Sequence, residues 1–389
     1  MKANMKRYPL FKVHVDLPSA MNNIEQVLSS GYINEGEQVT QLTQKLSEQL
    51  KADNLLLVNS CTSALTLALH AAGVRFLDSV VSTPMTCIAT NTPIHTHQAD
   101  IVWADIDPDT GCIDPDSVDE MLDSDANIPA VIAVAWAGNP PKLDALAKIC
   151  ELHDTKFILD AAHAFGAEYK GEPIHEWADF TCYSMQAIKH VTSGDGGILV
   201  SRESDLHKRV NNLKWFGIDR TVIKDSEDNW KGQSHDFDVL EAGYKFNMNN
   251  LSAALGLSQI PHIQKILDAH RANAAFYDRL LRDNAYIESL QTYEDAISSH
   301  WVYGVRMRPK YVHLRDELLK RLNDMGIEAG QVHVPNHVYT CFIESLAHLP
   351  GVEQFSSSQF ALPCGWWITE SDVQFITKTL NELCDAMIA

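Results

Sequence analysis

The chain has 389 residues, of which 45% are hydrophobic and 21% are charged. This amount of apolar material can form a large core, and we expect two domains. The formal net charge of −20 disfavours nucleic acids and anionic membrane surfaces as partners, because like charges repel. A local cationic pocket on such a chain can still bind an anionic small molecule.

Neither the cysteines nor the start of the chain points to a metal or to export. The eight cysteines include no CxxC pair, which argues against a zinc knuckle or a redox motif, and we expect no metal site. Residues 1–8 are basic, but no long apolar stretch follows them, so no secretion signal is expected. No apolar run approaches the length of a membrane span. We therefore expect a cytoplasmic protein with reduced thiols.

Short apolar runs alternate with helical patterns through the first part of the chain. Residues 1 to about 45 read as an arm and a short helix, with a turn at 31–36. Helices are predicted at 62–69 and 143–152. Strands are predicted at 55–58, 79–82, 100–103, 130–134, 157–159, 180–183 and 198–200. Because these strands are apolar throughout, we expect a mostly parallel sheet covered on both faces.

The pattern changes after about residue 250. Residues 251–281 are mostly helical with an interruption at Pro261, and a strand at 302–307 and helices at 314–325 and 372–386 follow. We place a domain boundary near residue 260. Residues 1–260 would form the arm and a large domain, and residues 261–389 a smaller α+β domain. The polar stretch 224–238 reads as an exposed loop.

Lys189 lies in an unusual setting for a lysine. It follows the predicted strand that ends at Tyr183 and precedes the turn Gly194-Asp195-Gly196-Gly197. Taken alone it would be a solvated surface lysine. Between two buried elements, however, desolvation lowers the pKa of an amine and makes it a better nucleophile. Such a lysine can form a Schiff base with pyridoxal phosphate (PLP).

Two other segments bear polar groups where ligands of α/β proteins gather. Asp160 ends an apolar strand, where a carboxylate could pair with a pyridinium nitrogen, although a helix N-cap is an equal alternative. His163 alone reads as a core or surface histidine. Residues 59–63 join a strand to a helix and form either an anion site or a plain Ser/Thr cap. Dinucleotide and P-loop motifs are missing from the sequence.

Four segments, in this order, resemble the DegT/DnrJ/EryC1/StrS family of sugar aminotransferases. They are Asn59-Ser60-Cys61-Thr62-Ser63-Ala64-Leu65, Asp160-Ala161-Ala162-His163-Ala164-Phe165-Gly166-Ala167, Ser184-Met185-Gln186-Ala187-Ile188-Lys189 with Gly194-Asp195-Gly196-Gly197, and Gly243-Tyr244-Lys245-Phe246-Asn247-Met248. Their spacing matches from about residue 25 to 375. The resemblance implies the α/β fold type I of PLP-dependent transferases, with active sites at a homodimer interface.

The resemblance also implies roles for the matching residues. Lys189 would be catalytic and would hold PLP as a Schiff base. Asp160 would pair with the pyridine nitrogen, and His163 would lie near the ring face and its 3′-oxygen. The phosphate would be bound by Thr62, the backbone around Cys61 and Ser63, the Ser184 hydroxyl, and Lys245 of the partner subunit. Many relatives carry Asn at this last position, but a cation suits a dianion.

Cys87 is a departure from the family pattern. Relatives usually place there an aromatic residue that stacks on the PLP ring, and cysteine cannot stack. Substrate contacts are predicted less directly. Arg220 could meet an anionic group, and His333 and His337 resemble the segment that faces the nucleotide sugar. Each of these has a plainer interpretation, as a surface arginine or a structural histidine.

The activity implied by the resemblance is transfer of an amino group from glutamate to a keto sugar. The acceptor would be a nucleotide-linked 4-keto-6-deoxy sugar, in amino-sugar biosynthesis for polysaccharide, O-antigen or secondary metabolites, with pyridoxamine phosphate between the two stages. The Gly-Tyr-Lys pattern, shared with the 4-amino-4-deoxy-arabinose branch, favours C4 over C3. The alternatives are a pyridoxamine-phosphate-dependent sugar dehydratase, a non-catalytic PLP-binding regulatory dimer, and an unrelated α/β protein.

Overall fold

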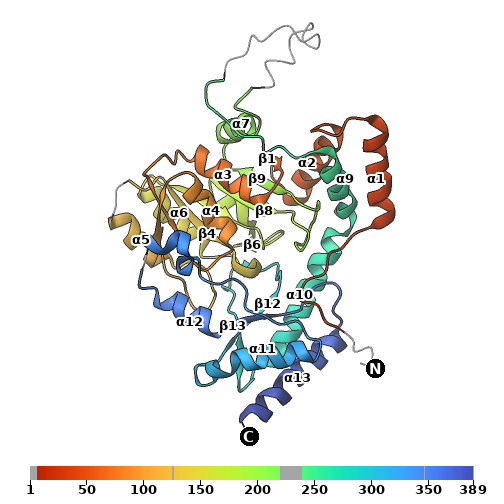
Figure 1. Ribbon diagram of the computed structural model, residues 1–389, viewed down its shortest axis with the longest axis vertical. Coiled ribbons are helices and arrows are strands. Elements are labelled where there is room, and N and C mark those ends of the chain that lie inside the picture. Colours follow the sequence, from red (N-terminus) through yellow and green to blue (C-terminus); the bar gives the residue numbers. More distant parts are fainter. Residues whose placement is uncertain (1–6, 125–126, 220–238, 346, 389) are drawn as a thin grey trace.

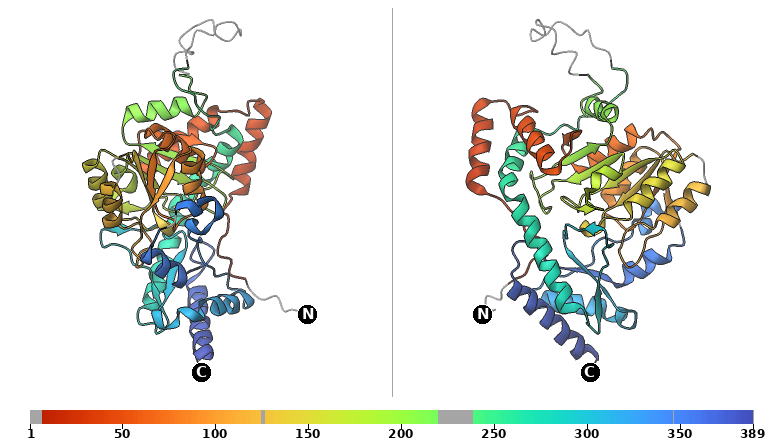
Figure 2. Two further views of the ribbon diagram at one scale, coloured as in Figure 1. Left: turned by 60° about the vertical axis from the view of Figure 1, so that its left-hand side comes forward. Right: turned by 180° about the vertical axis from the view of Figure 1, so that it is seen from behind.

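A computed structural model describes residues 7–124, 127–219, 239–345 and 347–388. Figure 1 shows a larger body built around a sheet, and a smaller body that carries the C-terminus. The long helix α10 (Ile263–Leu281) runs from one body into the other, which is clear from behind in Figure 2. None of the helices in the described ranges has the length and apolar character needed to cross a membrane.

The larger body contains a seven-stranded sheet. Its order is β1 (Leu55–Val58), β9 (Gly197–Ser201), β8 (Phe180–Ser184), β5 (Lys156–Asp160), β4 (Ala130–Val134), β2 (Ser79–Ser82) and β3 (Asp100–Trp103). Neighbours from β8 to β3 are parallel, and β9 is antiparallel to β1 and β8. The predicted strands and the mostly parallel sheet are confirmed.

The sheet is buried on both faces because its strands are mainly apolar, with the polar residues placed mostly at their ends. Leu55 and Leu57 lie in one hydrophobic core, while Leu56 and Val58 lie in the other. Helices α2 (Glu37–Leu50), α5 (Pro115–Ser124), α6 (Leu143–Leu152) and α9 (Asn250–Gln259) contribute to the first core. Helices α3 (Cys61–Ala71), α4 (Ile88–Thr96) and α7 (Ser204–Leu213) contribute to the second. The predicted three-layer α/β arrangement follows directly.

The N-terminal region differs from its prediction. Instead of one short helix, it contains α1 (Leu17–Ser30) as well as α2. The Asp16 side chain caps α1 by accepting from the Ser19 amide at 3.4 Å, and α1 ends at Gly31 with φ 71°. Ala20 and Val27 of α1 are buried, whereas Leu17 and Met21 face solvent.

The smaller body is built on an antiparallel sheet of β10 (Ile287–Ser289), β12 (Tyr303–Met307) and β13 (Gln359–Leu362). Helices α11 (Arg315–Asp324) and α13 (Glu370–Ile388) cover it. Short additional elements are α12 (Pro350–Ser358), β6 (Glu168–Tyr169), β7 (Glu172–Pro173) and β11 (Ala296–Ile297).

The helix α10 belongs to both bodies. Pro261 lies in the single 3-10 turn between α9 and α10, as predicted. Ile263 and Leu267 then pack in a core of the larger body, while Tyr277 and Leu281 pack in the smaller one. The domain boundary near residue 260 stays a prediction. In the structure, the start of α10 packs in the larger body and its end packs in the smaller body.

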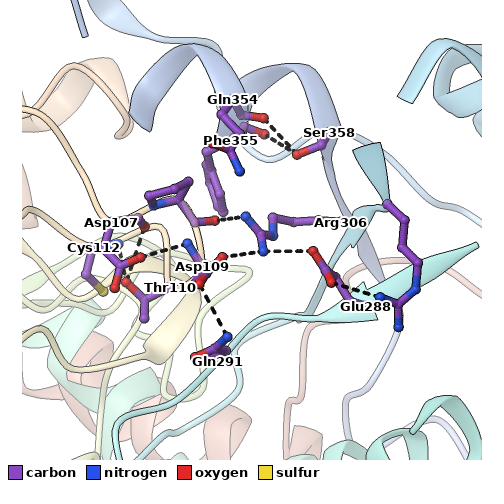
Figure 3. Close-up of polar contacts among 12 residues, drawn as sticks. Asp107, Asp109, Thr110, Cys112, Glu288, Gln291, Arg306, Gln354, Phe355 and Ser358 are labelled. Atoms are coloured by element: carbon purple, nitrogen blue, oxygen red, sulfur yellow. Dashed lines mark hydrogen bonds and ion pairs between the residues drawn. The ribbon is translucent and has the colours of Figure 1, made fainter. Parts of the chain in front are cut away.

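Arg306 of β12 ties the smaller body to the loop at residues 107–112 of the larger body (Figure 3). Its guanidinium donates to the Asp109 carboxylate at 2.5 Å, to the Glu288 carboxylate at 2.8 Å and to the Pro108 carbonyl. The Arg306 side chain is only 6% exposed, whereas those of Asp109 and Glu288 are 45% and 31% exposed. A buried cation thus depends on two carboxylates from different bodies.

Replacing Arg306 by Ala is expected to lower the free energy of unfolding by about 2–3 kcal/mol. The value is at the low end for a broken buried pair, because both carboxylates retain some solvent. Urea unfolding measures it. Arg308→Met is the matched control, since Arg308 pairs with the same Glu288 at 3.3 Å but is 39% exposed. The control should lose less than about 1 kcal/mol, and equal losses would contradict a linking role for Arg306.

Candidate functional site

The site lies at the carboxyl ends of two neighbouring parallel strands. Asp160 is the last residue of β5 and Ser184 is the last residue of β8. Because β5 and β8 are parallel and in register, with Asp160 opposite Cys182, both ends meet at one edge of the sheet. Lys189 follows Ser184 by five residues, in a turn rather than a helix. This is the position where open α/β sheets bind ligands.

Asp160 is a buried carboxylate held in a fixed orientation. One oxygen accepts from the Thr90 hydroxyl at 2.6 Å and the other from the Ala162 amide at 3.0 Å. Burial raises the pKa of Asp160, while these two hydrogen bonds and the charge of Lys189 act in the opposite direction. The carboxyl group can therefore pair with a cation that enters the site.

Lys189 is a partly buried amine among weakly acidic groups. Burial lowers its pKa to about 8, and the nearby Cys61, Asp160 and Cys87 oppose this shift. Its Nζ lies 3.9 Å from the centroid of the Trp301 ring. Near neutral pH a substantial fraction of the amine is unprotonated, as a nucleophile or a general base requires.

Three rings stack beside Lys189. The imidazole of His163 lies 4.0 Å from the Trp301 ring at an interplanar angle of 7°, and 5.4 Å from that of His333 at 10°. Burial lowers the pKa of His163 well below its usual value and that of His333 to about 4. Within the described ranges, His163 Nδ1 and His333 Nε2 are buried without a hydrogen-bond partner. Such atoms can bind a ligand.

The start of α3 faces the same region. Ser60 caps this helix by accepting from the Ser63 amide at 3.0 Å, and the Ser63 hydroxyl donates to Asn59 at 2.6 Å. The cap therefore uses both donors of Ser63, while the amides of Cys61 and Thr62 lie in the first turn, where helices bind anions. The cap is observed and is compatible with an anion site at the same turn, which stays a prediction.

Gly197 of β9 brings the sheet into contact with this helix start. A Cβ atom at Gly197 would lie 2.4 Å from the Ser60 carbonyl oxygen and 2.6 Å from the Cys61 amide nitrogen. Only glycine fits this approach. The Ser184 hydroxyl lies at the end of the adjacent strand β8, where it accepts from the Gln186 amide at 3.3 Å.

Cys87 precedes α4 and is partly exposed. It contributes to the electrostatic surroundings of Lys189, which places it in the same cluster. Three residues later, on the same helix, Thr90 contacts Asp160. The large aromatic ring in contact with Lys189 is that of Trp301, from the segment between β11 and β12.

Of the three substrate candidates, His333 lies in the cluster, and its backbone adopts φ 62°. His337 lies in the 3-10 turn Asn336–Val338 and is partly buried, and the charge that affects its pKa is that of Glu353 rather than Lys189. Arg220 lies outside the described residues. The fold thus places one of the three candidates, His333, close to Lys189.

Lys245 is held by its own turn. Its ammonium lies 3.8 Å from the Trp215 ring centroid and donates to the Asn247 side chain. Glu241, just before this turn, accepts hydrogen bonds from Arg209 and His70, and the Arg209 pair lowers the pKa of Glu241 to about 2.

Sequence reasoning missed Thr90, Asn91, Asn336 and Trp301. The Asn336 side chain donates to the Thr86 carbonyl at 2.9 Å and accepts from Asn91 at 2.8 Å, which fixes the loop before His337 against the segment before Cys87. A buried Asn or Thr has no sequence signature apart from its polarity. The position of Trp301 depends on the fold, because its contacts with His163 and Lys189 join segments far apart in the chain.

The chain is similar in structure to known sugar-modifying enzymes. The crystal structure of the sugar aminotransferase CalS13 from Micromonospora echinospora matches with a TM-score of 0.88 and 31% identity, over 96% of this chain and 99% of that one. The structure of AtS13 from Actinomadura melliaura matches with a TM-score of 0.89 and 34% identity, over 98% and 100%. The predicted fold type I transferase is confirmed, and the class of this protein is that of the aminotransferases.

The sequence comparisons agree. A transaminase of Campylobacter jejuni, named for UDP-4-amino-4,6-dideoxy-N-acetyl-beta-L-altrosamine, is 27% identical over 370 residues, which is 94% of this chain and 95% of the relative. The model of the DegT/DnrJ/EryC1/StrS aminotransferase family matches residues 17–381. The chain belongs to this family.

Gly197→Ala is expected to destabilise the start of α3, because its methyl group would clash with the Ser60 backbone. Overpacking of this kind costs about 1–3 kcal/mol or more. Thermal unfolding measures the loss. Gly330→Ala is the control, since nothing lies within 4 Å of a Cβ there, and it should change the melting temperature little. A Gly197→Ala protein as stable as the control would refute the close approach.

Proposed function

We propose that this chain is a PLP-dependent aminotransferase that moves an amino group from glutamate to a nucleotide-linked 4-keto-6-deoxy sugar. The observation that carries the proposal is Lys189, an amine whose pKa burial lowers to about 8, at the same sheet edge as the buried carboxylate of Asp160. Membership of an aminotransferase family supports the same reaction class.

The residues present fit PLP. The buried Asp160 carboxylate suits a protonated ring nitrogen, because hydrogen bonds from Thr90 and Ala162 favour its ionised form. His163 Nδ1, which has no partner among the described residues, suits the ring's 3′-oxygen or a neighbouring polar atom. The start of α3 suits a phosphate. When bound, PLP supplies an electron-accepting ring that stabilises negative charge on the carbon next to the amine.

Lys189 would then have two tasks. Its unprotonated amine would hold the cofactor, and, when free, it would take a proton from the substrate carbon and return it on the other side of the reaction. A pKa of about 8 suits both tasks, since the amine and its ammonium form are both populated near neutral pH. Asp160 would keep the ring nitrogen protonated throughout.

The phosphate would be bound by the amides of Cys61 and Thr62, the Thr62 hydroxyl and the Ser184 hydroxyl. The Ser63 amide donates to the Ser60 side chain, so we propose that Ser63 contributes by shaping this turn. Cys87 would lie beside the cofactor without stacking on it.

We further propose a homodimer in which Lys245 of one subunit reaches the phosphate of the other. Apolar side chains left exposed on α1 and the turn after it support a partner surface, because soluble proteins rarely leave such groups together in water. They are Leu17, Met21, Leu28, Tyr32 and Ile33. A dimer also suits a cytoplasmic enzyme of this family.

The name of the Campylobacter relative supports the sugar. It specifies a UDP-linked 4-amino-4,6-dideoxy sugar, which agrees with amination at C4 of a nucleotide-linked 6-deoxy sugar in amino-sugar biosynthesis. His333, His337 and Arg220 are proposed as contacts for this acceptor. Glutamate as donor, with pyridoxamine phosphate between the two stages, follows from the family resemblance.

Lys189→Ala is expected to lower transamination roughly 10²–10⁴-fold or more, because the chain loses its proton carrier. Borohydride reduction of the PLP-treated protein, followed by peptide mass spectrometry, should also place the adduct on Lys189 and leave the variant unlabelled. Lys378→Ala is the control, since that side chain is 76% exposed on α13. Wild-type turnover by the Lys189 variant would sink the assignment.

Product analysis separates the proposal from its rivals. With glutamate and a UDP-linked 4-keto-6-deoxy sugar, the proposal predicts an amino sugar and 2-oxoglutarate in equal amounts. A deoxy sugar without an amino group would instead indicate the dehydratase. PLP binding without any product from a panel of nucleotide sugars would favour the regulatory dimer.

A further inference from the structure

The site has Cys87 where an aromatic residue was expected. The large aromatic side chain of Trp301 lies instead against Lys189. Its ring centroid is 3.9 Å from Lys189 Nζ and 4.0 Å from the His163 ring centroid, and Phe11 stacks on it at 4.7 Å. The Trp301 residue is 5% exposed. Among aromatic side chains, the indole of tryptophan attracts a cation over its face most strongly.

We propose that Trp301 is a positioning residue that seats the ammonium group of Lys189 whenever the amine is not attached to the cofactor. The inference rests on the proposed role of Lys189 and deepens it. Trp301 acts through Lys189 and takes no part in bond making itself.

The indole is fixed relative to the lysine backbone. Trp301 Nε1 donates to the carbonyl of Ile188, the residue before Lys189, at 2.9 Å. The Trp301 amide donates to the Ala137 carbonyl at 2.9 Å. Since both ends of the residue are held, the ring cannot swing away without breaking a hydrogen bond in the interior.

The segment that carries Trp301 is also tied to the residues around the site. The Ser299 hydroxyl donates to the His163 carbonyl at 2.8 Å, and the Ser298 hydroxyl donates to the Gly138 carbonyl at 2.9 Å. A Cβ at Gly138 would lie 2.5 Å from the Ser299 hydroxyl, so this contact needs glycine. Ser298 and Ser299 thus help to place the indole ring of Trp301 beside His163 and Lys189.

A two-stage transfer needs such a seat. Under the proposed function, the lysine amine would hold the cofactor at rest and would be free while it carries protons, so its buried ammonium form would need stabilisation without a fixed ion pair that held it permanently. An indole face attracts the ammonium without forming a directional hydrogen bond. This weaker, non-directional attraction would also let the amine return to the cofactor.

The expected consequence concerns the charge of Lys189. The titratable groups that act on it or its neighbours are Asp160 of β5, Cys61 of α3, Cys87 before α4, and the histidines His163, His190 and His333. Burial keeps the histidines neutral near pH 7. Removing the indole withdraws attraction from the ammonium only, so the pKa of Lys189 should fall relative to its value in the native protein.

The test is competitive labelling of the cofactor-free protein with a trace of acetic anhydride, with peptide mass spectrometry of Lys189 at each pH. Only the neutral amine reacts, so labelling rises with pH through the pKa. Trp301→Leu is expected to move the midpoint down by about half to one pH unit, and Trp301→Phe by less, because a phenyl face binds cations more weakly. An unchanged midpoint in Trp301→Leu overturns the proposal.

Two controls make the result specific. Trp177→Leu removes an indole that contacts Tyr169 edge-on at 5.4 Å, and should leave the midpoint of Lys189 unchanged. If Trp301→Leu does not fold, Trp301→Phe decides by the same measurement, and a midpoint equal to that of the native protein counts against the proposal. Circular dichroism of each variant reports folding.

Failure of the proposed function would look different. Absence of a borohydride-trapped adduct on Lys189 in the native protein would remove the PLP reaction, whatever the labelling midpoints are. An adduct in the native protein together with identical midpoints in all Trp301 variants would remove only the role of Trp301.

Discussion

The parallel pairing of β5 with β8 is the constraint on which the site depends. It brings Asp160 and Ser184 to one edge of the sheet, and the chain leaving β8 then carries Lys189 across that edge. The antiparallel strand β9 closes the arrangement, because Gly197 allows it to touch the start of α3. The Asp160 carboxylate, the Lys189 amine and the start of α3 thus lie close together, although about 130 residues separate the start of α3 from Lys189 in the sequence.

Burial determines which side chains in this cluster carry a charge near pH 7. The histidines around Lys189 are buried deeply enough that their pKa values fall, so they are neutral near pH 7. The pKa of the lysine falls only to about 8, and it retains positive charge for much of the time. In a chain with a net charge of −20, the site is therefore a small region where one cation faces one carboxylate and neutral rings.

The sequence could predict those parts of the fold and site that depend on the residue pattern within one short segment. Continuous apolar strands predicted the buried sheet, and a strand end and an apolar setting marked Asp160 and Lys189 as candidates, whereas the role of Ser184 was implied by the family resemblance. Thr90, Asn336 and Trp301 were missed because their positions depend on tertiary contacts with segments far along the chain. The sequence predicted one short N-terminal helix, whereas the structure has two, α1 and α2, on either side of the predicted turn at 31–36.

The helix α10 has a consequence for how the molecule loses its structure. Its first turns are packed in the larger body and its last turns in the smaller one, and a helix melts cooperatively along its length. Loss of either core therefore removes support from the other. The two bodies are coupled in unfolding, so amide hydrogens in both should exchange through shared openings rather than body by body.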